Sequence, residues 1–154
     1  MTDAAPSEGR PANGRRAARR LAIQALYQWD LTGDGIGDII TQCVEREPGR
    51  MAVDYGYFEE MVRGVAGSVS TLDPEFEKCL DRPVDQLDPI ERAVLRAGTW
   101  EFVNRLDVPY RVVINESVEL AKTFGAEEGH KYINGVLDKL AKHLRAIETQ
   151  RGAR

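Results

Sequence analysis

The chain has 154 residues, of which 42% are hydrophobic and 30% charged, and its formal net charge is −4. This length and composition are typical of one compact globular domain or two small helical halves. No apolar run approaches the roughly 18 residues that a membrane span needs, and the N-terminal segment lacks the apolar stretch of a secretory signal. We therefore expect a cytoplasmic protein that contacts no membrane.

The N-terminal third is expected to hold an arm and two helices. Residues 1–13 are rich in Ala, Pro and Gly and are predicted to form a disordered arm. Apolar residues recur at helical spacing from Arg15 to Leu31, with Asn13 as the candidate N-cap and Gly33 as the stop. A second, short helix is predicted over 36–45.

Five further helices are predicted, over 54–69, from 73 to just before Pro83, over 89–105, over 109–124 and over a last apolar stripe from 133 to 144. Asp73-Pro74 and Asp88-Pro89 each place an N-cap carboxylate before a proline at the first helical position. Glu91 completes a capping box with Asp88. Seven helices and no strand predict an all-α domain over 14–145, followed by a flexible tail over 146–154.

The charges are unevenly distributed along the chain. Residues 1–20 contain five arginines, and no acidic residue lies between Glu8 and Asp30. A cation in the first turns of a helix faces the positive end of the helix dipole, at a cost of a few tenths to about 1 kcal/mol. Helix N-termini and arginines both favour phosphate, so this placement indicates an anionic partner. A basic end beside an acidic middle indicates two different partners.

One stripe of the first helix combines cations with an aromatic ring. On a wheel of about 100° per residue, the stripe beside the apolar face holds Arg16, Arg20, Ile23 and Tyr27. Charges that follow a phosphate backbone and a ring that stacks on a base suit single-stranded nucleic acid. The alternative is a solvated charged face with Tyr27 at the edge of the core.

A pair of aromatic residues near the C-terminal end of the chain is a second candidate for base stacking. Phe124 and Tyr132 flank the turn between Gly125 and Gly129, with His130 and Lys131 close by. Exposed aromatic rings beside a cation would form a second base-stacking contact. The alternative is that both rings belong to the core.

An acidic run occupies the middle of the chain between Asp73 and Glu91. Such a run is either a solvated face or a docking surface for a basic protein. Glu91 also has a structural explanation, because a capping box accounts for a glutamate at this position.

Catalytic and metal-binding patterns are absent from the sequence. We find no GxGxxG after a strand, no phosphate loop, no GxSxG and no HExxH. Cys43 and Cys79 form no CxxC and are predicted to be buried free thiols, while His130 and His143 lack metal-ligand spacing. We therefore predict no enzyme, no metal site and no cofactor.

Three stretches resemble the NusB family: RRAARRLAIQALYQWD (15–30), LDPIERAVLRAGTWE (87–101) and DVPYRVVINESVELAKTFGAEEGHKYINGVLDK (107–139). The third stretch is the most specific of them. Tyr132 and Ile133 stand where the family pattern has Phe-Val or Phe-Ile, which keeps an aromatic ring at the first position. The resemblance spans residues 15–145.

The resemblance implies a fold of two perpendicular three-helix bundles plus an extra helix. It implies a transcription antitermination factor that binds the boxA sequence of ribosomal RNA leader transcripts together with NusE, a small-subunit ribosomal protein. The complex joins RNA polymerase and suppresses premature termination. The RNA-binding positions implied by the family's arginine-rich helix and Phe-Gly turn, together with Arg20 of the basic stripe, are Arg15, Arg16, Arg19, Arg20, Tyr27, Phe124, Glu128, Lys131 and Tyr132. The implied NusE-binding positions are Glu91 and Asp85.

Two other classes of function are considered. A NusB-like domain also begins certain rRNA cytosine methyltransferases, which need a further parallel sheet with a cofactor loop, and the absence of such a pattern from this sequence disfavours that class. The second alternative is a helical protein–protein module or homodimer without an RNA role, since some NusB proteins are thought to self-associate.

Overall fold

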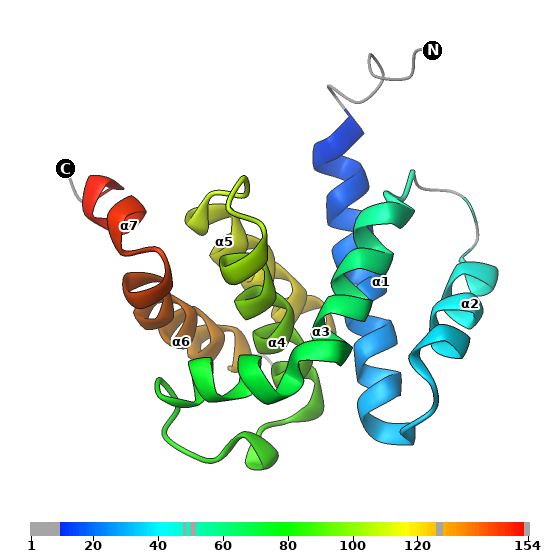
Figure 1. Cartoon of the computed structure of the whole chain (residues 1–154), viewed down its shortest axis with the longest axis horizontal. Helices are drawn as coiled ribbons and strands as arrows, with labels where there is room; N and C mark the ends of the chain where they lie inside the picture. The colour runs from blue at the N-terminus through cyan, green and yellow to red at the C-terminus, as the bar shows by residue number, and fades with distance from the viewer. Residues whose placement is uncertain (1–9, 48, 50–51, 126–127, 153–154) are drawn as a thin grey trace. The chain divides into compact units, whose positions relative to one another are not determined.

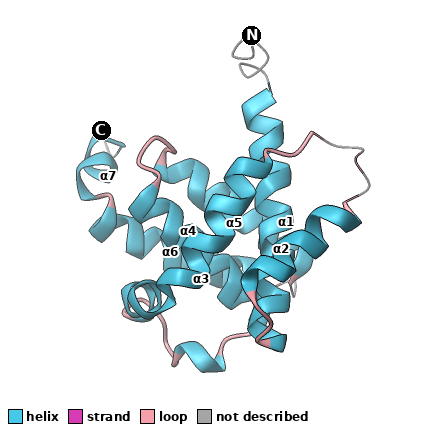
Figure 2. Cartoon of the chain, turned by 45° about the vertical axis from the view of Figure 1, so that its right-hand side comes forward, coloured by secondary structure: helices cyan, strands magenta, loops and turns pink. Residues whose placement is uncertain are grey.

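The structure, a computed structural model, describes residues 10–47, 49, 52–125 and 128–152 (Figure 1). Within these residues the chain forms seven α-helices and one short 3-10 turn, and it contains no strand (Figure 2). The predicted all-α class is confirmed. The chain divides into two compact units, Met1–Ala66 and Gly67–Arg154, which are described separately below.

The first unit contains α1 (Arg10–Thr32), α2 (Ile36–Arg46) and the N-terminal part of α3 (Tyr55–Glu77). Helix α1 packs against α2, and Gln28 Nε2 donates a hydrogen bond to Gln42 Oε1 at 3.0 Å. The buried residues of this unit recur at helical spacing and include Ala18, Ala22, Ile23, Leu26, Ile39, Ile40, Phe58, Met61, Val62 and Val65. This periodicity is the reason why the sequence forms amphipathic helices here.

Helix α1 begins earlier than the sequence predicts. It starts at Arg10, so Asn13 lies inside the helix and is not its N-cap. Pro11 falls in the first turn, where a missing N–H removes no intrahelical hydrogen bond, so the proline does not prevent this start. The remaining part of the predicted arm, residues 1–9, lies outside the described residues. At the other end Gly33 has a φ of 72° and its N–H bonds to the Trp29 carbonyl, which confirms the predicted stop.

Helix α3 merges two segments that the sequence separates. Only Ser68 departs from helical geometry, with φ −130° and ψ 17°, and the helix continues through Asp73 and Pro74. Asp73 is therefore not an N-cap, and the separate helix predicted from this point is wrong. The Asp73 carboxylate instead accepts hydrogen bonds from Arg96 Nε and Nη2 at 2.9 and 2.8 Å. Because helical geometry resumes after Ser68, Pro74 lies in the second turn of the resumed segment, close to its start.

The second unit is built on three helices that pack against one another: α4 (Pro89–Asn104), α5 (Tyr110–Phe124) and α6 (Gly129–Leu144). The 3-10 turn η2 (Val84–Gln86) precedes α4, and α7 (Ala146–Gly152) packs against α6. Asp88 caps α4 as predicted, because its Oδ1 accepts a hydrogen bond from the Ile90 N–H at 2.8 Å.

Helix α4 is buried on all sides over the ten consecutive residues from Ala93 to Phe102. The spacing of the apolar residues in this segment predicts a one-sided helix whose core face consists of Ile90, Val94, Ala97, Gly98, Phe102 and Val103. Val103 is instead exposed. The buried stretch includes Arg96, whose charge is compensated by the Asp73 carboxylate, with side chains 11% and 19% exposed. In α2 the same spacing predicts that Ile36, Ile39, Ile40, Cys43 and Val44 face the core, and Val44 is likewise exposed.

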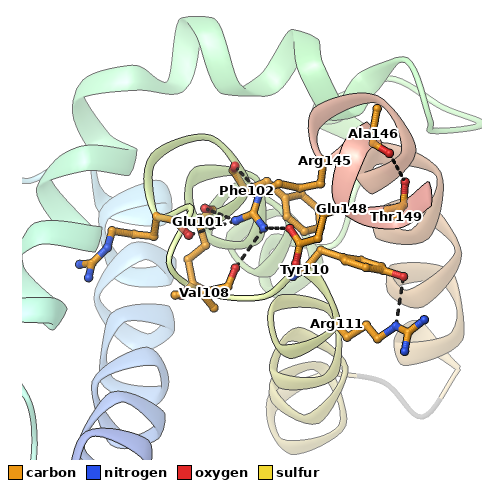
Figure 3. A network of polar contacts seen from close by, with 10 residues as sticks. Glu101, Phe102, Val108, Tyr110, Arg111, Arg145, Ala146, Glu148 and Thr149 are labelled. Atoms are coloured by element: carbon orange, nitrogen blue, oxygen red, sulfur yellow. Dashed lines mark hydrogen bonds and ion pairs between the residues drawn. The ribbon is translucent and has the colours of Figure 1, made fainter. Parts of the chain in front are cut away.

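The expected flexible tail is a helix over residues 146–152, and it is anchored by the buried side chain of Arg145 (Figure 3). The guanidinium donates hydrogen bonds to the main-chain carbonyls of Glu101, Phe102, Arg105 and Val108 at 2.9 to 3.3 Å. Arg145 Nη1 also bonds to Glu148 Oε1 of α7 at 2.6 Å, and Glu148 Oε2 accepts the Tyr110 N–H at 2.9 Å. These bonds explain why residues 146–152 form a helix. The spacing of apolar residues in the sequence gives no indication of such polar contacts.

Candidate nucleic-acid interface

The arginines of α1 divide into two pairs that face different surroundings. Arg16 and Arg20 are exposed, and the exposed side continues through Gln24 and Tyr27. The spacing of four, four and three residues puts these side chains on one face of the helix. Ile23, which the sequence analysis placed in the same stripe, is fully buried in the core. The outer stripe of α1 (Arg16, Arg20, Gln24 and Tyr27) is therefore a basic surface with an aromatic ring at one end.

Arg15 and Arg19 turn toward Tyr57 of α3. Their guanidinium carbons lie 4.5 and 5.6 Å from the centroid of the Tyr57 ring. Arg19 and Tyr57 are only 5% and 3% exposed. A buried guanidinium beside an aromatic face is stabilised by cation–π attraction. No sequence pattern singles out Tyr57, because it precedes the apolar stripe of its helix.

Hydrogen bonds of Asp54 connect the N-terminal ends of α1 and α3. The Asp54 N–H donates to the Gly14 carbonyl at 3.1 Å, and Asp54 Oδ1 accepts the Tyr57 N–H at 3.0 Å. The carboxylate therefore caps α3 and at the same time fixes the start of the helix that carries Tyr57. This arrangement holds Tyr57 beside the first turns of α1, where Arg15 and Arg19 lie.

The second predicted RNA-binding group lies in the other unit, around the turn before α6. Phe124 is half-buried, and residues 126–127 of the turn lie outside the described residues. Glu128 and Lys131 are exposed, with Lys131 Nζ 3.5 Å from Glu128 Oε1. Tyr132 is partly exposed, so its ring is neither a core side chain nor fully in solvent.

Tyr132 is bound to a loop residue that the sequence analysis did not single out. Its hydroxyl donates to Asp81 Oδ1 at 2.8 Å and accepts the Asp81 N–H at 3.2 Å. Arg82 donates from Nε and Nη2 to the same carboxylate at 2.7 and 3.3 Å, and its guanidinium carbon lies 4.7 Å from the Tyr132 ring centroid. Hydrogen bonds from Arg82 and Tyr132 lower the pKa of Asp81 to about 2. We call these three residues the Tyr132 cluster.

The acidic edge predicted for a protein partner lies beside this cluster. Asp85 is exposed in η2, whereas Glu91 is half-buried at the start of α4. Burial, and then the neighbouring charge of Asp88, raise the pKa of Glu91, while a hydrogen bond from the Asp88 backbone and the charge of Arg82 lower it. Glu91 thus interacts with the Asp88 backbone as the predicted capping box requires, whereas the Asp88 carboxylate bonds to the N–H of Ile90, one position earlier than in a capping box. The charge of Arg82 acts on Glu91, so the Tyr132 cluster and the acidic edge are close enough to interact electrostatically.

Neither cysteine is suited to thiolate chemistry at neutral pH. Both thiols are free, with Cys43 buried and Cys79 partly exposed, and burial is the main cause that raises the pKa of each. Within the described ranges, no group of three or more His, Cys, Asp or Glu side chains is arranged to hold a metal ion. The same part of the chain has no helix that is long and apolar enough to cross a membrane.

Fold and surface together define an all-helical protein with a basic helix stripe in one unit and an aromatic–cation cluster beside an acidic edge in the other. The family comparison matches residues 16–142 to the NusB family. Two curated relatives bear the name transcription antitermination protein NusB. The relative from Marinomonas sp. (strain MWYL1) is 54% identical over 135 residues, which cover 87% of this chain and 78% of the relative. The one from Pseudomonas putida (strain W619) is 49% identical over 148 residues, which cover 95% of this chain and 89% of the relative.

Solved structures agree with the sequence relatives. T. maritima NusB superimposes with a TM-score of 0.75 at 28% identity, covering 83% of this chain and 90% of that chain. A crystal structure of the antitermination factors NusB and NusE in complex with double-stranded RNA gives a TM-score of 0.73 at 32% identity, covering 83% and 96%. The chain belongs to the NusB family.

Proposed function

We propose that this protein is a transcription antitermination factor that binds boxA RNA of ribosomal RNA leader transcripts together with NusE. In this role it joins the antitermination complex of RNA polymerase and acts in the cytoplasm as a non-catalytic adaptor. The observation that carries the proposal is the outer stripe of α1, where Arg16, Arg20 and Tyr27 stand exposed on one face. Family membership supports it, because the related NusB protein of known structure was crystallised with NusE and RNA.

The four arginines of α1 have different roles in this proposal. Arg16 and Arg20 are exposed and would pair with phosphates, while Tyr27, 36% exposed, would stack on a base. Arg15 and Arg19 lie against Tyr57, so we assign them mainly to positioning the start of α1. Phosphates would still experience their charge, since electrostatic attraction does not need direct contact.

The turn before α6 would supply the second RNA contact. Lys131 is exposed and offers an ammonium to the backbone, and Tyr132 and Phe124 offer partly exposed rings. Glu128 pairs with Lys131 and would orient it, or accept a hydrogen bond from a base edge.

Asp85 and Glu91 would face NusE. A ribosomal protein is typically basic, so an exposed carboxylate at Asp85 and a half-buried one at Glu91 offer complementary charge. The interaction with the Asp88 backbone favours one orientation of Glu91 before any partner arrives. This preorganisation lowers the cost of ordering the side chain on binding.

The test is binding of a labelled boxA RNA against a scrambled RNA, with and without NusE, over a series of salt concentrations. We expect preference for boxA, a higher affinity with NusE, and a log–log salt slope of about −2 to −3, as for three or four phosphate contacts on single-stranded RNA. Elution volume with and without RNA distinguishes the homodimer alternative, because a dimer that masks the RNA surface would dissociate as RNA is added. Equal binding of both RNAs, unchanged by NusE, would overturn the proposal.

A further inference from the structure

Arg82 is held in one place by two neighbours although it lies at the surface. Asp81 accepts two hydrogen bonds from its guanidinium, and the Tyr132 ring lies 4.7 Å from the guanidinium carbon. The Tyr132 hydroxyl in turn both donates a hydrogen bond to Asp81 and accepts one from it. The three side chains therefore form a closed arrangement in which each one positions the next.

Stability alone does not explain this arrangement. The side chains of Arg82 and Asp81 are 42% and 65% exposed, and ion pairs with this exposure contribute little to stability because solvent screens them. A long arginine side chain also loses rotamer freedom when it is fixed. An ordered but exposed guanidinium is instead the feature expected of a binding residue.

The chemistry of the cluster suits a planar aromatic ligand. The bidentate bond to Asp81 occupies donors in the plane of the guanidinium, and Tyr132 lies on one side of it. A guanidinium plane stacks on nucleobases in the same way as an aromatic ring does. We propose that Arg82 is a base-stacking residue of the RNA-binding surface, with Asp81 and Tyr132 as its positioning residues. This proposal rests on the proposed function and adds a contact to it.

The surrounding charge favours a nucleic acid over an acidic or neutral ring compound of another kind. Three exposed lysines lie around the cluster although acidic residues are also near it. Lys131 is beside Tyr132 and pairs with Glu128, Lys78 pairs with Glu75, and the charges of Lys139 and Lys78 both act on Cys79, three residues before Arg82. Exposed cations around a stacking residue would attract the phosphates on either side of a stacked base.

The experiment measures affinity of the full chain for labelled boxA RNA, using the Arg82→Ala and Arg82→Lys variants. Arg82→Ala should weaken binding about fivefold or more, the loss expected for one stacked base. Arg82→Lys should weaken it to a similar extent, because lysine keeps the charge but has no planar face. Wild-type affinity in either variant would overturn the proposal.

RNAs with single abasic positions identify the stacked base. One abasic position should weaken binding by the wild-type chain, and the same position should cost nothing further in Arg82→Ala. A purely structural role of Arg82 would instead weaken all the RNAs equally, and that result would also overturn the proposal.

Two controls separate this inference from the proposed function. Arg111→Ala removes another exposed arginine beside a tyrosine, with its guanidinium carbon 5.5 Å from the Tyr110 ring, and it should leave RNA affinity unchanged. If Arg16→Ala weakens binding while Arg82→Ala does not, the inference fails and the proposed function stands. If the wild-type chain shows no preference for boxA, both fail.

Discussion

The carboxylate of Glu91 lies directly beside the α-carbon of Gly129, where an added Cβ would stand 2.8 Å from Oε2. No real Cβ approaches an oxygen this closely, so a side chain at position 129 and the present position of Glu91 exclude each other. The two residues join the start of α4 to the start of α6. The proposed partner surface and the proposed second RNA contact therefore meet at this point.

Gly129→Ala is expected to move the Glu91 carboxylate without unfolding the chain. The clash falls on the far end of a flexible side chain, and alanine is favoured over glycine in a helix by up to about 1 kcal/mol. The free energy of unfolding should therefore change by less than about 1 kcal/mol, while affinity for NusE falls as it does in Glu91→Ala. Urea denaturation and titration calorimetry measure the two quantities. If Gly129→Ala weakens NusE binding further in a Glu91→Ala background, the effect does not pass through Glu91.

The exposed and buried arginines of α1 should respond differently to substitution. Arg16→Ala or Arg20→Ala should weaken RNA binding about fivefold, for a contact of about 1 kcal/mol, and reduce the salt slope by about 0.7. Melting should be unchanged in both variants. Arg63→Ala is the matched control, since Arg63 is an exposed arginine paired with Glu59 on α3.

Arg19→Ala should lower stability instead. Arg19 is 5% exposed and lies over Tyr57, so its loss removes packing and a cation–π contact worth about 1–2 kcal/mol. Thermal melting and RNA affinity measured on one preparation separate the two effects. An unchanged melting curve with lost RNA binding would make Arg19 a direct RNA contact.

Local signals made most of the helical fold predictable. Gly33, Asp88 and Gly125 mark helix ends in the sequence because turn and cap chemistry is local, and the structure places ends at or beside all three. Asp73-Pro74 carries the same signal as Asp88-Pro89, yet only Asp88 is a cap. Asp73 is used in a long-range pair with Arg96, and sequence spacing holds no information about such a partner.

The candidate sites were predictable only in part for the same reason. Helical spacing groups Arg16 and Arg20, but the burial of Arg19 depends on Tyr57, which lies on another helix. Arg82 lies in a sequence run that is mostly acidic, so it was not singled out. Its position over Tyr132 depends on a contact between distant chain segments, since Asp81 and Tyr132 are 51 residues apart in the sequence. Family resemblance supplied positions that local patterns did not, while the orientation of each side chain needed the structure.

The stability of the protein should depend on pH through Glu91. Burial and Asp88 raise its folded pKa above the ordinary value of 4.5. The unfolded chain therefore loses this proton first, and the contribution of Glu91 to the free energy of unfolding falls as pH rises above about 4.5 through the folded pKa. Glu91→Gln keeps an acceptor for the Asp88 N–H but cannot ionise. It should match the wild type near pH 4 and be more stable at pH 7. Urea denaturation at both pH values measures this, and a variant less stable at pH 7 than the wild type would contradict the sign.

Arg145 should be the most sensitive position of the second unit. Its side chain is 4% exposed and donates hydrogen bonds to four main-chain carbonyls and to Glu148. Removing it leaves buried carbonyls without their donor, at about 1–3 kcal/mol each, so Arg145→Ala should lower the free energy of unfolding by about 3 kcal/mol or more. Arg145→Lys should recover little, because one ammonium cannot reach acceptors spread around a planar fork. Arg151→Ala, which removes an exposed arginine of α7, should change stability by less than about 0.5 kcal/mol. Urea denaturation compares the three variants, and an Arg145→Ala variant as stable as Arg151→Ala would show that the buried network contributes little to the fold.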